Sequence, residues 1–315
     1  MTIVVVGGTG FIGRALCRTL VQAGHRVTVL SRSPEAHRGA LPPPVAFLAW
    51  DGRTRESWAQ VLAGADAVVN LAGENIAKKR WTDNRKEELR NSRLLTTHLL
   101  VQAMAGLSKR PAILINASAI GYYGPRDETP VSEWTTTGTD FLADLCVAWE
   151  QEASGAEALG LRVVRLRIGL VLGEDGGALP RMVFPFQFFL GGPISPGSQW
   201  ISWVHRHDLA NLIHWTLSHP EVHGAVNGVA PGAVTMDEFC RTLGRVLDRP
   251  CWLPVPEIAL RIALGELATL LTTGQRVEPT VALRAGFVFQ YPSLEPALQS
   301  LLRTTAESRD VSKQP

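Results

Sequence analysis

Cysteine is scarce in this sequence, and the few cysteines are not arranged in pairs. The chain of 315 residues contains four, Cys17, Cys146, Cys240 and Cys251. Their spacing matches neither a disulfide framework nor a zinc site, and three of them fall in apolar stretches, as is typical of buried thiols in a reducing compartment. The N-terminus also lacks the basic n-region of a secretory signal, because a strand pattern starts there at once. We therefore expect a cytoplasmic protein.

The sequence has no large excess of charge of one sign and no long hydrophobic run. The 31 basic and 29 acidic residues leave a formal net charge of +2, so the chain has no basic field of the kind that captures nucleic acid. The densest charge run, Lys78 to Arg93, is typical of a solvated loop and helix face. Apolar runs such as Ile258 to Leu271 contain charged residues and are too short to span a bilayer. We expect no nucleic-acid partner and no membrane partner, and the sequence does not indicate an oligomeric state.

What the chain does have is a glycine turn directly after its first strand. Residues 3–13 read Ile-Val-Val-Val-Gly-Gly-Thr-Gly-Phe-Ile-Gly, and an apolar helical pattern follows. Gly7 allows a sharp turn, Gly10 lets the backbone approach a pyrophosphate, and Gly13 lets the helix pack closely on the sheet. The N–H groups at the start of that helix would face the phosphates, although glycines also recur in plain strand-helix turns. The residues expected around the phosphates are Gly7, Thr9, Gly10, Phe11, Ile12 and Gly13.

The end of the second expected strand, at 27–30, bears on the choice of cofactor. NAD-binding folds usually carry an acidic residue there to bind the adenosine ribose. This chain reads Ser31-Arg32-Ser33 instead, and a hydroxyl with a guanidinium suits a 2′-phosphate. The sequence therefore favours NADP(H) as cofactor, and the alternative is that Arg32 is only an exposed loop arginine. Asp51, which follows the third expected strand, is a further candidate for cofactor contact.

Strand and helix patterns alternate along the first half of the chain. After the first strand, strands are expected at 27–30, 45–49, 67–73, 112–116 and 161–172, and helices after Gly13 and at 84–104 and 141–158. This alternation predicts an α/β fold with a Rossmann-type, doubly wound parallel sheet. Ligands bind such sheets at the carboxyl edge. The cofactor candidates at that edge are Asn70, Leu71, Ala72 and Gly73, and the catalytic candidates are the hydroxyl-bearing Ser118, Tyr122 and Tyr123.

Beyond Gly173 the rhythm changes, because glycines, prolines and clustered phenylalanines interrupt the alternation. We expect an NADP-binding Rossmann domain, a smaller and mainly helical C-terminal substrate lobe, and a disordered tail. The Rossmann domain would take 1–173 with a return at 201–229, the lobe 174–200 and 230–305, and the tail 306–315. The clustered phenylalanines are more typical of a core than of a cofactor site.

One group of polar residues outside the sheet could suggest a metal. His205, His207 and Asp208 stand close together in the sequence, where a strand pattern passes into a helix. Aspartate at a helix start is, however, a common cap. We therefore expect no metal site.

Several segments occur in the order seen in extended short-chain dehydrogenase/reductases. They are Gly7 to Gly13, Asn70 to Gly73, Ser118 with the tyrosines after it, Arg167, and Val204-His205 to Asp208. A closer resemblance, to epimerase-family proteins of the YfcH / SDR39U type, rests on Asn70-Leu71-Ala72-Gly73-Glu74-Asn75-Ile76, Arg80-Trp81, Ser92-Arg93, Gly191-Gly192-Pro193, Asn227-Gly228-Val229-Ala230-Pro231 and the Gly286-Phe287 region. The resemblance covers almost the whole chain. It implies bound NADP(H), with Arg167 among the cofactor-binding residues, and a cleft between the Rossmann domain and the C-terminal lobe.

The chain departs from this pattern at the proton-transfer dyad. Extended members usually carry a Tyr-x-x-x-Lys pair on the helix that here starts near Phe141, and the lysine lowers the tyrosine pKa so that the phenol can exchange a proton with the substrate oxygen. Aligned on Glu150, the two positions are Leu142 and Cys146. An apolar side chain cannot transfer that proton, and a neutral thiol supplies no positive charge. Ser118 matches the hydroxyl that holds the substrate oxygen, but its usual partners are missing.

Two functions of different classes fit these residues. The first is an NADPH-dependent oxidoreductase acting on an unknown small carbonyl or sugar-like substrate, with Ser118 on a substrate oxygen. Tyr123 or Tyr122, with Glu74 or Lys78 nearby, would supply the proton, and Tyr123 is the preferred donor. Sugar-nucleotide epimerisation is disfavoured, because reversible oxidation of a hydroxyl depends on the missing base. The alternative is a non-catalytic NADP(H)-binding sensor whose lobe closure reports the cofactor redox state to a partner.

Overall fold

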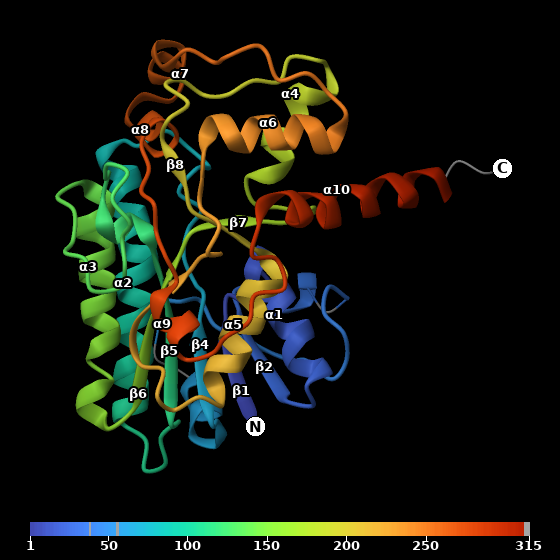
Figure 1. The fold of residues 1–315 in the computed structure, drawn as a ribbon. Helices are drawn as coiled ribbons and strands as arrows, with labels where there is room; N and C mark the ends of the chain where they lie inside the picture. The colour runs from blue at the N-terminus through green and yellow to red at the C-terminus, as the bar shows by residue number, and fades with distance from the viewer. Residues whose placement is uncertain (38, 55–56, 312–315) are drawn as a thin grey trace.

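The computed structural model describes residues 1–37, 39–54 and 57–311, which form a Rossmann-type sheet with a second lobe above it (Figure 1). Seven parallel strands have the order β10-β6-β5-β4-β1-β2-β3. They are β1 (Thr2–Val6), β2 (Arg26–Ser31), β3 (Ala46–Ala49), β4 (Ala67–Asn70), β5 (Ile113–Ala119), β6 (Arg162–Ile168) and β10 (Gly224–Gly228). The strand order reverses between β1 and β4, so the carboxyl ends of these two strands flank the crevice where α/β sheets bind ligands.

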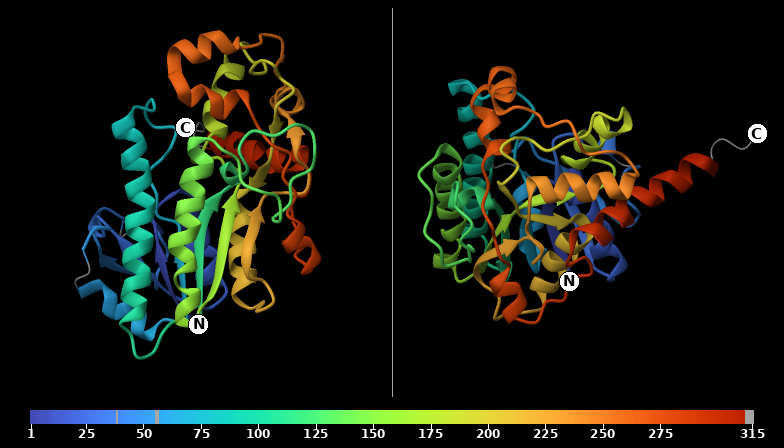
Figure 2. Two further views of the ribbon diagram at one scale, coloured as in Figure 1. Left: turned by 90° about the vertical axis from the view of Figure 1, so that its left-hand side faces the viewer. Right: turned by 45° about the horizontal axis from the view of Figure 1, so that its top comes forward.

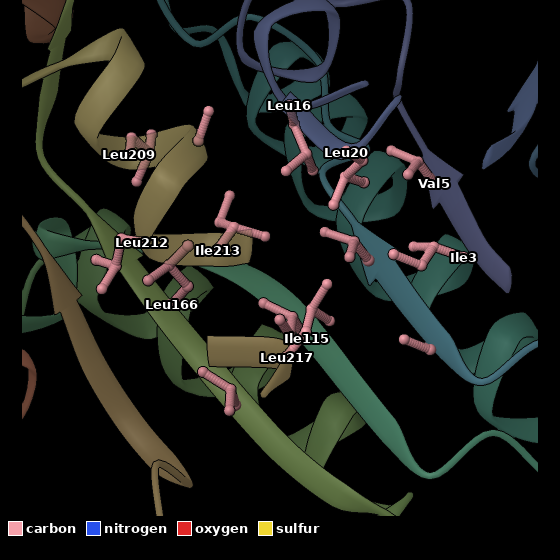
Figure 3. Packing of buried hydrophobic residues seen from close by; sticks show 14 of the residues in the cluster. Ile3, Val5, Leu16, Leu20, Ile115, Leu166, Leu209, Leu212, Ile213 and Leu217 are labelled. Atoms are coloured by element: carbon pink, nitrogen blue, oxygen red, sulfur yellow. The ribbon is translucent and has the colours of Figure 1, made fainter. Parts of the chain in front are cut away.

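Helices cover both faces of the sheet. Helices α1 (Phe11–Gln22) and α5 (Arg206–Leu217) lie on one face, and α2 (Asp83–Ala105) and α3 (Phe141–Ser154) lie on the other (Figures 1 and 2). On the first face Leu20 of α1 belongs to the same buried cluster as Ile3 and Val5 of β1 (Figure 3). On the second face Leu100 of α2 packs in a cluster with Val4. Alternate residues of β1 thus enter different cores, which is the pattern of a parallel sheet buried on both faces.

Local sequence signals fix where several helices begin. The Thr82 hydroxyl accepts a hydrogen bond from the backbone N–H of Arg85 at the start of α2. The Asp140 carboxylate accepts one from Ala143 at the start of α3. Such side-chain caps satisfy N–H groups that have no partner within the helix.

The second lobe lies above the carboxyl ends of the strands (Figures 1 and 2). Its elements are α4 (Leu179–Gln187), β8 (Trp200–Ile201), β11 (Val234–Thr235), α6 (Met236–Leu247), α7 (Glu257–Leu264), η5 (Gly265–Ala268), α8 (Thr269–Thr272) and α10 (Leu294–Val311). Phe186, Trp203 and Phe239 are among the residues of its buried core. The remaining elements are β7 (Leu170–Leu172), β9 (Trp203–His205), α9 (Thr280–Arg284) and the 3₁₀ turns η1 (Glu35–His37), η2 (Ser57–Gly64), η3 (Ile120–Tyr123) and η4 (Glu157–Leu159).

The expected fold class is confirmed, but several strand bounds differ from the expectation. The strand expected at 67–73 ends at Asn70, and the one expected at 112–116 runs from Ile113 to Ala119. The single strand expected at 161–172 is two strands, because the chain leaves the main sheet at Gly169 and β7 pairs in parallel with β9. A Cβ on Gly169 would lie 2.5 Å from the carbonyl oxygen of Ser202, so only glycine permits this crossing. Helix α10 runs through Val311, although a disordered tail is expected at 306–315; residues 312–315 lie outside the described residues. Within the described part of the chain, no helix is both long and apolar enough to cross a membrane.

Candidate functional site

The glycine turn between β1 and α1 has the shape that its sequence predicts. Gly7 adopts a φ of +76°, and its carbonyl oxygen accepts a hydrogen bond from the N–H of Gly10 at 3.0 Å. A Cβ on Gly13 would lie 2.2 Å from that same carbonyl oxygen, so the helix can pack this closely only with glycine there. A Cβ on Gly10 would meet only the carbonyl oxygen of Gly7, at 3.2 Å, which leaves the outer side of the turn open to a ligand.

The N-terminus of α1 is suited to bind an anion. Gly10 is its N-cap residue, no side chain caps the helix, and no acidic residue stands in the first turn. The unpaired N–H groups and the positive end of the helix dipole therefore face outward together. Phe11 is held against the loop after β7, where a Cβ on Gly173 would lie 2.7 Å from its ring, and the carbonyl of Thr9 accepts a hydrogen bond from Arg14. These residues fit the pyrophosphate of a dinucleotide.

Arg32 directly follows β2 and is held only loosely by the protein. Its side chain is 76% exposed and pairs with Glu74 at 3.6 Å, a contact that solvent screens. The neighbouring Ser31 is buried, and its hydroxyl accepts a hydrogen bond from the N–H of Ser33. A guanidinium held this loosely can turn to a ligand without leaving a buried charge behind.

Asp51 follows β3 at the same edge, but its carboxylate is occupied by its own loop. It accepts hydrogen bonds from the N–H groups of Arg53 and Thr54 and from the Thr54 hydroxyl. The backbone hydrogen bonds of Arg53 and then Thr54 lower the Asp51 pKa. The carboxylate is solvent-exposed, so a cofactor contact remains compatible with this arrangement.

Asn70 anchors the loop that follows β4. Its amide donates to the Thr97 hydroxyl at 3.1 Å and to Asn116 Oδ1 at 2.7 Å, while its own oxygen accepts from the N–H of Ala72. Asn70 is fully buried, so it shapes the loop and is not itself exposed to a ligand. The backbone of Leu71 and Ala72 then passes over the glycine turn, where a Cβ on Gly7 would lie 2.9 Å from the carbonyl of Leu71, and Gly73 follows it toward Arg93.

Ser118, near the end of β5, belongs to a buried ionic network that the sequence does not predict. Its hydroxyl donates to Glu150 Oε1 at 2.7 Å, and Arg167 binds both oxygens of the same carboxylate at 2.8 Å. Burial by itself lowers the pKa of Arg167, but its bonds to Glu150 raise it overall. The guanidinium of Arg167 thus has its hydrogen-bond partners inside the protein, which gives no support to a cofactor contact, and the expectation that Arg167 binds the cofactor stays a prediction.

The two tyrosines that follow have different environments. Tyr123 is 0% exposed; its hydroxyl accepts from Arg167 at 3.0 Å and donates to Asn227 Oδ1 at 2.7 Å. Burial raises the pKa of Tyr123 to about 12. Tyr122 is half-buried, with its ring stacked on the Arg167 guanidinium at 3.4 Å. Tyr122 is therefore the more accessible of the two phenols, and the assignment of Tyr123 as proton donor stays a prediction.

The two positions aligned with the dyad, Leu142 and Cys146, lie on α3 next to the segment that follows β5. A Cβ on Gly121 would lie 3.2 Å from Cβ of Leu142, so Leu142 closes the side of the η3 turn. Cys146 is buried, and burial raises the pKa of its thiol to about 12. A neutral thiol therefore stands where the resemblance to extended members implies a lysine.

Two acidic residues of this region were missed from the sequence. Glu150 lies on the buried face of α3, and Glu133 accepts hydrogen bonds at Oε1 from the N–H groups of Asn227 and Val281. Burial raises the pKa of Glu133. The available signal was Arg167 itself, because an arginine inside a buried parallel strand requires an acidic partner.

The metal candidates are used for packing. His205 is the N-cap of α5, and its ring stacks on Tyr291. Asp208 is not the cap: it lies within the first turn of α5, where its carboxylate accepts from the N–H groups of Gln290 and Tyr291. Across the described ranges, no three histidine, cysteine or acidic side chains are grouped to hold a metal ion.

Comparison with known proteins adds family relationships to this geometry. The NAD dependent epimerase/dehydratase family matches residues 3–228, and a domain of unknown function (DUF1731) matches residues 255–301. The chloroplastic SDR39U1 homolog of Arabidopsis thaliana, an epimerase family protein, is 41% identical over 308 residues, which cover 96% of this chain and 87% of that protein. The human epimerase family protein SDR39U1 is 38% identical over 306 residues, which cover 96% of this chain and 100% of that protein.

Solved structures of epimerase family proteins are also similar to this chain. The crystal structure of human SDR39U1 (isoform 2) with NADPH has a TM-score of 0.84 and 35% identity to this chain, and the match covers 96% of this chain and 99% of that one. UDP-glucuronic acid 4-epimerase from Bacillus cereus, solved with UDP-glucuronic acid and NAD, has a TM-score of 0.79 at 15% identity, covering 98% of this chain and 100% of that one. At that identity the second match establishes the fold alone.

Proposed function

Because the chain belongs to the NAD dependent epimerase/dehydratase family, we propose that it binds NADP(H) and reduces a small carbonyl or sugar-like compound at the expense of NADPH. The observation that carries the proposal is the uncapped N-terminus of α1 together with the exposed Arg32 at the end of β2. The first is an anion site for the pyrophosphate, and the second is a loose cation for the 2′-phosphate. The NADPH in the human relative supports the same cofactor.

The chemistry of the site divides between cofactor and protein. When bound, the nicotinamide would supply the hydride. Tyr122 is the residue of this chain best placed to supply a proton, because its phenol is half-buried at the carboxyl end of β5. Ser118 already donates its hydroxyl hydrogen to Glu150, so it can contribute to substrate binding only through the oxygen lone pair that remains.

A non-catalytic NADP(H) sensor is the second candidate function. The observation that favours it is the burial of Ser118, Tyr123 and Cys146. Only the Tyr122 phenol is then left in a region where the resemblance to extended members implies both a tyrosine and a lysine. Both candidate functions use the same cofactor-binding half of the site. The two functions are therefore separated by turnover and not by cofactor affinity.

Calorimetric titration with NADPH and NADH tests the cofactor assignment. We expect the protein to prefer NADPH, and Arg32→Asp to weaken NADPH binding by roughly ten- to a hundredfold, the scale of one hydrogen bond to a charged group. Arg18→Asp, which makes the same charge change at an exposed position of α1, is the matched control. Equal binding of both cofactors by the unmodified protein would refute the assignment.

A screen of carbonyl compounds for NADPH consumption tests the reaction. Turnover that Tyr122→Phe lowers by about a hundredfold, with little change in NADPH affinity, is the expected result for the reductase. NADPH binding without consumption of any carbonyl compound in the screen favours the sensor.

A further inference from the structure

Arg93 of α2 reaches across to the loop that follows β4. Its guanidinium donates through Nη2 to the carbonyl of Glu74 at 3.0 Å and through Nη1 to the carbonyl of Leu89 at 3.1 Å and the hydroxyl of Ser92 at 3.3 Å. A Cβ on Gly73 would lie 3.2 Å from Cζ of Arg93. The positive charge is therefore held directly against the cofactor-side loop, at the one residue of that loop without a side chain to cover it.

On its other side this guanidinium faces the helix that has lost the dyad. Its Cζ lies 5.2 Å from the centre of the Trp149 ring, one turn beyond Cys146 on α3. Burial lowers the pKa of Arg93, and the neighbouring Cys146 and Glu74 oppose that shift. An arginine stays protonated in spite of such burial. A fixed cation thus stands beside the position where extended relatives carry lysine, supplied by a different helix.

The place of Arg93 along the sheet edge decides which part of a dinucleotide it can reach. Arg32 directly follows β2, which lies on one side of β1, so the 2′-phosphate end of the cofactor belongs there. The pyrophosphate belongs at α1, and the dinucleotide crosses the switch point between β1 and β4. Arg93 lies beyond that point, between the end of β4 and α3, and so it faces the nicotinamide half.

We propose that Arg93 binds the ribose hydroxyls on the nicotinamide side of the cofactor and supplies there the positive charge that Cys146 cannot. A guanidinium has five N–H donors, and the three hydrogen bonds with described residues use three of them. The remaining donors match the oxygens of a vicinal diol. The inference rests on the proposed NADP(H) binding, and it makes Arg93 a cofactor-binding residue.

A cofactor fragment separates this role from a structural one. Adenosine 2′,5′-bisphosphate carries the 2′-phosphate end of NADP and has no nicotinamide ribose. Arg93→Gln is expected to weaken NADPH and NADH alike, by roughly ten- to a hundredfold, and to leave the affinity for the fragment within about twofold. Arg93→Lys should recover part of the loss, and Arg90→Gln on the same helix is the control. Arg32→Asp should give the opposite pattern, with the fragment and NADPH weakened and NADH spared.

A second variant keeps the positive charge of Arg93 but blocks access to its guanidinium. Gly73→Ala places a methyl group against the guanidinium, so it should weaken NADPH binding while circular dichroism and fragment binding stay unchanged. Unchanged NADPH affinity in Arg93→Gln would overturn the inference, as would an equal loss for NADPH and the fragment, because the second result means that Arg93 only holds the loop. A wild-type protein that binds neither NADPH nor the fragment would overturn the proposed function as well. If the wild-type protein binds NADPH and Arg93→Gln binds it equally well, the inference about Arg93 is overturned and the proposed function stands.

Discussion

The ion pair between Glu150 and Arg167 should be the strongest single polar contribution to the stability of the site. Both side chains are nearly excluded from water, at 9% and 5% exposure, and two parallel hydrogen bonds of 2.8 Å join them. Glu150→Gln removes the negative charge and puts an NH₂ group opposite a guanidinium or the Ser118 hydroxyl. The variant therefore leaves a buried cation without its counter-ion and at least one donor without an acceptor.

The expected cost follows from this burial. Removing one partner of a buried, hydrogen-bonded ion pair costs about 3–5 kcal/mol, because the remaining charge is left uncompensated in a medium of low polarity. The pair between Arg245 and Glu295 is the matched comparison. It has an N–O distance of 3.2 Å, but its side chains are 61% and 47% exposed. Solvent screens such a pair, so Glu295→Gln should cost no more than about 1 kcal/mol.

Urea unfolding followed by far-ultraviolet circular dichroism measures both variants under the same conditions. We expect Glu150→Gln to unfold at a clearly lower urea concentration than the wild-type protein, and Glu295→Gln to unfold close to it. If Glu150→Gln costs no more than Glu295→Gln, the network around Arg167 does not depend on its charge and the argument from burial fails.

Three further outcomes follow from the structure. Burial lowers the pKa of His205 to about 4, below its reference value of 6.5, so this group stabilises the fold above pH 6.5 and loses roughly 3 kcal/mol as the pH falls from 6.5 toward 4. His205→Asn, which can still cap α5, should flatten that part of the pH dependence in urea unfolding; an unchanged slope would contradict the assignment. Gly10→Val should abolish NADPH binding in calorimetry with an unchanged circular dichroism spectrum, and retained binding would make the glycine turn merely structural. Tyr123→Phe should lower the urea midpoint by removing the partner of a buried Asn227, while Tyr122→Phe should leave it nearly unchanged, and the reverse order would contradict the burial of the two phenols.

Much of the fold and the phosphate turn could be predicted from the sequence, because both depend on local rules. Apolar strands, helical periodicity and capping residues each act over a few positions, and they recur often enough to identify a doubly wound sheet. Gly7 and Gly13 have a conformational or packing requirement that no other residue meets, so the turn can be predicted from the local sequence alone. The place of Arg32 at the ligand-binding edge can be predicted for a related reason, because Arg32 directly follows a strand whose carboxyl end must lie at that edge.

The direction of each polar side chain at that edge was decided only by the tertiary structure. Tyr122 and Tyr123 are neighbours on a 3₁₀ turn, whose residues point about 120° apart, so one ring covers Arg167 while the other enters the core. Arg167 is drawn inward because Glu150, far away in the sequence, lies on the buried face of α3. The sequence by itself determined which chemical groups reach the end of the sheet. Contacts between elements that are distant in the sequence decided which of these groups face a ligand. The reason is that a buried charge must pair with an opposite charge, and that partner can come from any part of the chain that the fold brings close.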